Sequence, residues 1–217
     1  RVALAIGAVE LVLLGALVTA LVTGGVVWFW QEREPAMRAA ITVTDPSVAQ
    51  LRSFRDTRVF FGHMSVGSNV IGGVGQTLAA VGESAPPVVE TKESVTVGGG
   101  FLAHAQMGVN GEPYGKFADF VAVLDGSLGR QLDVAVFKLC YLDVVANTDV
   151  DALFRAYSSM MAGLERKYPS VRFVYTTVPL TTDRGWKATV KSWIGQDDQM
   201  GPADNVARQR YNELVRQ

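Results

Sequence analysis

From residue 57 onward, short apolar runs alternate with longer segments whose apolar residues recur every three or four positions. The short runs predict buried strands, and the wider spacing predicts amphipathic helices. The clearest strand is Asp133–Leu139, and the clearest helix is Asp151–Lys167. Strands alternating with helices are typical of a parallel sheet covered on both faces. The pattern therefore predicts an α/β domain over residues 57–217.

The remaining elements follow from the same pattern. Gly100–Gln106 is expected to be a loop that borders the ligand-binding edge of the sheet. An additional helix is expected near residue 46, with Asp45 as its N-cap and Pro46 at its first position. The other predicted strands are Val59–Phe61, Pro86–Glu90, Ser94–Val97 and Val171–Val178, and the other predicted helices are Ser68–Val81, Lys116–Leu124 and Pro202–Arg216.

Before this domain lies Leu11–Trp30, a run of 20 residues without a charge. At about 1.5 Å per residue a helix of this length spans the hydrocarbon core of a bilayer. A signal peptide is the alternative, but this run is longer than a usual signal core and ends in bulky tryptophans. The sequence predicts a transmembrane anchor over residues 1–30 and a juxtamembrane linker with a helix over 31–56. The positive charges around the run do not decide its orientation.

Composition and motifs argue against several classes of function. The formal net charge is -1 and the basic residues are scattered, which argues against nucleic-acid binding. Cys140 is the only cysteine and there are two histidines, and their spacing matches no metal site. No Gly-Lys-Ser/Thr follows the first strand, and Gly72–Gly75 falls inside a predicted helix, so neither a P-loop nor a dinucleotide site is expected. We predict no metal and no cofactor.

The candidate chemistry lies where the first strand ends, at Gly62-His63-Met64-Ser65-Val66-Gly67. In open parallel sheets, ligands bind outside the carboxyl ends of the strands. The helix that follows would offer free N–H groups to a developing negative charge. Ser65 is therefore a candidate nucleophile. The alternative is that the turn contains glycine and serine only because its backbone geometry requires them.

Four short segments follow one another in the order Phe61–Gly67, Asn110-Gly111, Phe137–Asp143 and Tyr175–Thr181. In this order they resemble the SGNH (GDSL-type) hydrolase superfamily, and in particular a bacterial, often membrane-anchored branch with a Gly-His-x-Ser-Val-Gly signature. The resemblance implies a flavodoxin-like three-layer α/β/α fold and serine-dependent ester hydrolysis. Asn205-x-x-Arg208-x-x-Tyr211-Asn212 is similar to the helix before the last motif of that superfamily.

The resemblance also assigns roles to residues. It makes Ser65 the nucleophile and gives the oxyanion hole to the N–H groups of Ser65 and Gly111, with Gly108 as the next choice. Leu142 stands in the third motif, where the superfamily has an asparagine donor. Asp143 would hold the loop or orient a partner there, and Asn69 or Asn110 would supply the missing amide.

The general base of the superfamily lies in an Asp-x-x-His motif, which these 217 residues do not contain. We therefore expect that the sequence is truncated and that the base lies beyond Gln217. His63 occupies the acidic position of the first motif, either bonding the loop backbone or contacting substrate. His104 is either a substrate contact or a satisfied loop histidine. Lys138 would be neutralised by an acid such as Asp143, and Cys140 would be a small buried apolar residue.

These observations predict a membrane-anchored, single-pass serine ester hydrolase with an extracytoplasmic domain. By analogy with the superfamily, its substrate would be an acetylated glycan of the envelope. The fragment itself is expected to be inactive without its base. Two alternatives stay open: an inactive SGNH-like module that binds a glycan or a protein, and an O-acyltransferase.

Overall fold

The computed structural model describes residues 46–182, 190 and 199–217. Within them, five parallel strands form a sheet in the order β2-β3-β1-β4-β5. The strands are β1 (Arg58–His63), β2 (Val88–Glu90), β3 (Phe101–Gln106), β4 (Val134–Phe137) and β5 (Arg172–Val174). The predicted α/β class is confirmed, and β1 lies at the centre of the sheet.

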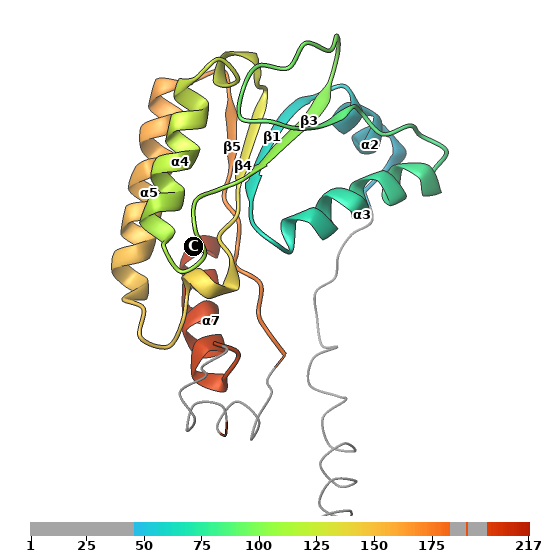
Figure 1. Cartoon of the computed structure of the whole chain (residues 1–217). Coiled ribbons are helices and arrows are strands. Elements are labelled where there is room, and N and C mark those ends of the chain that lie inside the picture. Colours follow the sequence, from blue (N-terminus) through green and yellow to red (C-terminus); the bar gives the residue numbers. More distant parts are fainter. Residues whose placement is uncertain (1–45, 183–189, 191–198) are drawn as a thin grey trace, which may run out of the picture. The chain divides into compact units, whose positions relative to one another are not determined.

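Helices cover both faces of this sheet, as Figure 1 shows. One face carries α2 (Val48–Arg55) and α3 (Gly67–Ala80). The other carries α4 (Pro113–Asp125), α5 (Val150–Lys167) and α7 (Pro202–Arg216), while short 3₁₀ turns follow α4 (Gly129–Gln131) and β4 (Tyr141–Asp143). The arrangement is consistent with three α/β/α layers.

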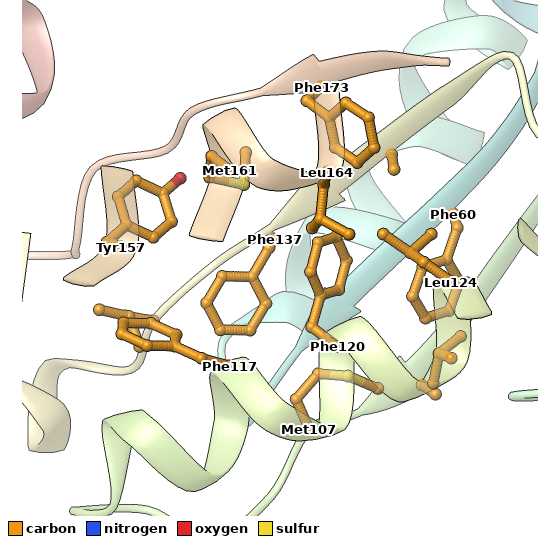
Figure 2. Packing of buried hydrophobic residues seen from close by; sticks show 14 of the residues in the cluster. Phe60, Met107, Phe117, Phe120, Leu124, Phe137, Tyr157, Met161, Leu164 and Phe173 are labelled. Carbon is orange, nitrogen blue, oxygen red and sulfur yellow. The ribbon is translucent and has the colours of Figure 1, made fainter. Parts of the chain in front are cut away.

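Alternation along the strands divides the core between the two faces. Phe60 and Phe137 point toward α4 and α5, where they join the larger apolar cluster around Phe120 (Figure 2). Their neighbours Phe61 and Val136 point toward α2 and α3 and join a smaller cluster. Because side chains alternate along a strand, the polar residues at the strand ends are also assigned to one face or the other.

Helix α3 is weakly tied to this core. Only Gly67 and Leu78 are buried along its length. It also contains Gly72, Gly73 and Gly75, and a Cβ added at any of these three would meet nothing within 4 Å. The helix is thus held mainly by residues at its two ends and by the partly buried Ile71 and Val74 between them.

The structure corrects several predicted elements. Phe101–Gln106, expected to be a loop, is strand β3 and lies next to the central strand. Ser94–Val97, expected to be a strand, is irregular. β5 ends at Val174 rather than at Val178. The apolar run that follows the three glycines at 98–100 predicts β3 better than the isolated valines at 95 and 97 predict a strand.

The compact unit runs from Pro46 to Gln217. Helix α2, predicted to be part of the linker, therefore lies within it, and Ser47 rather than Asp45 is its N-cap. Leu51 and Phe54 attach this helix to the rest of the unit. Leu11–Trp30 lies outside the described residues. Among the helices that the structure describes, none has the length and apolar character needed to cross a bilayer.

Candidate functional site

The turn between β1 and α3 brings Ser65 to the surface. Ser65 is exposed and has a φ of 43°, in the left-handed region that side chains with a Cβ rarely occupy. The N–H of Gly67 donates to the carbonyl of Met64, which closes the turn. Within the described part of the chain, the N–H groups of Ser65 and Val66 have no acceptor. The turn thus presents a hydroxyl beside two free donors.

Gly67 is required where α3 begins, because the ring of His63 lies against it. A Cβ at Gly67 would come within 2.3 Å of both Cγ and Nδ1 of His63. Atoms cannot approach so closely, so a larger residue would have to push the imidazole or the first turn of α3 aside. Gly67 therefore allows the strand end and the helix start to come into contact.

Replacing Gly67 with alanine should lower the free energy of unfolding by about 1–3 kcal/mol, as overpacking does in a tight core. Gly72→Ala is the matched control, because it lies in the same helix with open space around it. That change should instead raise the stability by about 0.5–1 kcal/mol. Urea unfolding of both variants measures the difference, and equal effects would contradict the contact described at Gly67.

The two histidines of the chain lie together at this edge of the sheet. Nε2 of His63 is 3.2 Å from Nδ1 of His104, so the two imidazole rings are within hydrogen-bonding distance of each other. His63 is buried, and its other ring nitrogen, Nδ1, has no hydrogen-bond partner. Burial lowers the pKa of His63 and the charges of His104 and Lys138 lower it further, while Glu90 and the backbone of Met64 act in the opposite direction. Burial and the neighbouring positive charge thus favour the neutral form of the His63 imidazole.

Lys138 lies next to this pair of histidines. Its N–H donates to the carbonyl of Gly62, so the β1–β4 ladder continues one step beyond the pair Gly62–Phe137 and places Lys138 beside His63. Its side chain is buried, and burial lowers its pKa. The predicted ion pair between Lys138 and Asp143 is wrong, because Asp143 binds a different lysine.

That lysine is Lys116, on α4. Its Nζ lies 2.6 and 2.8 Å from the two carboxylate oxygens of Asp143, and neither side chain is exposed. Asp143 also accepts the N–H groups of Gly111 and Cys140, and Lys116 donates to Oδ1 of Asn110. These bonds tie the loop before α4 to the loop after β4. Asp143 therefore holds both loops at the carboxyl edge of the sheet.

This network argues against the predicted oxyanion donors. The N–H of Gly111 is bonded to Asp143, and the N–H of Gly108 is bonded to Asp119 at 2.9 Å. Neither group is free to bind a developing oxyanion in this arrangement. The free donors of the region are the N–H groups of Ser65 and Val66 described above. The free donors at this edge of the sheet therefore come from one turn rather than from two.

The roles expected for Asn69, Asn110 and Cys140 stay predictions. Asn69 is exposed near the start of α3. Asn110 bonds Lys116 through its oxygen, which leaves its amide nitrogen available. Cys140 is buried and free. Among the described residues, no three His, Cys, Asp or Glu side chains are grouped as metal ligands would be.

Helix α7 contributes a set of contacts that sequence reasoning did not predict. Asn212 pairs with both the N–H and the carbonyl of Val178, and Asn205 pairs in the same way with Thr181. Arg208, between them on the same face of the helix, is fully buried and donates to the carbonyl of Tyr141. The spacing of Asn205, Arg208 and Asn212, which places them on one face of a helix, was the feature of the sequence that could have indicated these contacts. They hold the segment after β5 against the loop after β4.

A hollow with both polar and apolar walls lies between the amino ends of α4 and α5. Its lining includes Glu112, Tyr114, Asn147 and Asp149, and Gly111 and Asp143 reach it from the loop network. Tyr114 is 57% exposed there. Such a mixture of one open aromatic ring with amides and carboxylates can bind a hydroxyl-rich ligand.

Comparison with protein-family models, with curated proteins and with solved structures gave no match.

Proposed function

We propose that this chain is a serine-dependent ester hydrolase with Ser65 as its nucleophile. The observation that carries the proposal is the conformation of Ser65, an exposed residue at a left-handed position directly after the central strand. The two free N–H groups of this turn support it. The resemblance to SGNH hydrolases points to the same residue.

The proposed reaction is acyl transfer to Ser65 followed by hydrolysis. The Ser65 oxygen attacks the ester carbonyl, a base takes the hydroxyl proton, and the N–H groups of Ser65 and Val66 bind the tetrahedral oxyanion. The ester C–O bond then breaks and the alcohol leaves with that proton. Water attacks the acyl-serine, which releases the acid and restores the hydroxyl.

We propose an acetylated glycan as the substrate class and a membrane surface as the location. The substrate class rests on the resemblance, and the exposed Tyr114 in the hollow between α4 and α5 supports it. The second rests on the charge-free run Leu11–Trp30 in the sequence. Both go beyond the geometry of Ser65 and can fail without affecting the hydrolase proposal.

Replacing Ser65 with alanine in the complete protein should reduce hydrolysis of p-nitrophenyl acetate at least about a thousandfold, because the nucleophile is removed. Ser68→Ala is the matched control, since Ser68 is an exposed serine three positions further along the same turn and helix. A fluorophosphonate probe should label the parent protein and the Ser68 variant but not the Ser65 variant. Unchanged turnover after Ser65→Ala would refute the assignment.

A second function is a binding module that keeps the fold without turnover. The bonds from Gly108 and Gly111 to carboxylates favour it, and so does the Ser65 hydroxyl, which makes no hydrogen bond to any described residue. Such a module would resist the fluorophosphonate, and Ser65→Ala would leave its ligand affinity unchanged. Labelling and ligand titration of the same two proteins therefore separate the two functions.

A further inference from the structure

The two buried lysines at the carboxyl edge of the sheet have very different partners. Lys116 bonds both oxygens of Asp143 and the side chain of Asn110. Lys138 is 9% exposed, and its Nζ makes one hydrogen bond, of 3.2 Å, to the carbonyl of Leu139. Among the described residues, no carboxylate forms an ion pair with it. A buried ammonium group with one weak acceptor is costly unless an anion accompanies it.

The surroundings of Lys138 reinforce this imbalance. Val134 and Val136 point toward α3, and Lys138 continues that alternation on the same face as His63. Nδ1 of His63 is buried, has no partner and lies against Gly67, the first residue of α3. Two buried polar groups, one with a single weak acceptor and one without a partner, therefore share one face beside the start of a 14-residue helix, whose dipole favours negative charge.

Negative charge near this cluster is limited. Glu90 is the one carboxylate that raises the pKa of His63, and it is exposed on the edge strand β2. It pairs in register with His104 and makes no ion pair with Lys138 in the described part of the chain. Asp143 is buried and its charge raises the pKa of Lys138, but its carboxylate is paired with Lys116. In the described part of the chain, no carboxylate therefore forms an ion pair within the cluster of Lys138, His63 and His104.

We propose that Lys138 and His63 bind a small oxyanion, a carboxylate or phosphate group, at the start of α3. The anion would accept hydrogen bonds from Nζ of Lys138 and from Nδ1 of His63, which satisfies both groups. A further step rests on the proposed function. If Ser65 is the nucleophile, the bound anion is part of the substrate. The substrate class is then an ester that also carries negative charge.

Inorganic phosphate and acetate are the probes, each titrated calorimetrically into the full chain at constant ionic strength set with chloride. Replacing Lys138 with methionine should weaken binding of the better probe about tenfold to a hundredfold, as expected for lost hydrogen bonds to a charged group. Lys167→Met is the control, since Lys167 is exposed and paired with Asp125. It should bind like the parent protein. The preferred probe identifies the anion as phosphate or carboxylate.

Two results would overturn the proposal: no binding of either probe, or equal binding by the parent protein and the Lys138 variant. If Lys138→Met does not fold, the parent protein still gives the test, because the anion must shift the NMR signals of the Lys138 ε-CH₂ and the His63 ring. Absence of those shifts refutes the site. Ser65→Ala should bind the probe normally, so failure of the anion site and failure of the hydrolase proposal are distinguished.

Discussion

Replacing Asp143 with alanine should lower the free energy of unfolding by about 3–5 kcal/mol, the range found when one partner of a buried ion pair is removed. The change leaves the ammonium of Lys116 without its carboxylate, and neither side chain is exposed in the intact pair. It also leaves the N–H groups of Gly111 and Cys140 without an acceptor. Denaturation in urea, with midpoint and slope fitted together, measures the loss.

Asp133→Ala is the matched control for this experiment. Asp133 pairs with Arg58, but the two side chains are 41% and 45% exposed. Exposed pairs contribute about 0–1 kcal/mol, so the control should change stability little. A double variant, Lys116→Met with Asp143→Leu, should recover much of the stability, because it removes both charges. Equal losses in Asp143→Ala and Asp133→Ala would contradict the buried network.

Arg208→Met should destabilise the protein by about 3 kcal/mol or more. The guanidinium is fully buried and donates to the carbonyls of Tyr141 and Gln199 and to the hydroxyl of Thr181. Without it these acceptors stay buried with fewer donors, and each unsatisfied group costs about 1–3 kcal/mol. The comparison of urea midpoints between parent and variant gives the size of the loss.

Arg210 provides the control on the same helix. It is 48% exposed and pairs with the exposed Asp151, so Arg210→Met should change stability by less than about 1 kcal/mol. If the two arginine variants unfold at the same urea concentration, Arg208 does not anchor the segment after β5. Because Arg208 contacts that segment and the loop after β4, its loss should also reduce any ester hydrolysis by Ser65.

The periodic parts of the fold could be predicted from the sequence. The strand before Ser65 and the helix Asp151–Lys167 have strong patterns, and the structure confirms both as β1 and α5, within a residue or two at each end. β3 was missed because Phe101–Gln106 is short, contains a histidine and follows three glycines. Residues of this kind are also common in loops. Only the pairing of this segment with β1 and β2 decides that it is a strand and not a loop.

The site was less predictable because its contacts are distant in sequence. The exposed turn at Ser65 follows from local pattern, but the contact of His63 with His104 depends on the register of two strands. Asp143 had two lysines available, and the sequence contains nothing that favours Lys116, on α4, over Lys138, next to β4. The choice follows from which side of the sheet each lysine occupies.

The glycines of α3 have a consequence for motion at the site. Each glycine inside a helix costs about 1 kcal/mol relative to alanine, and α3 contains three with open space around them. With so few buried side chains, we expect this helix to open locally more readily than the sheet and the α4–α5 layer. Such a local opening would expose the ring of His63 and the side chain of Lys138 to solvent without global unfolding. Ligands could thus reach buried polar groups that the closed arrangement keeps from solvent.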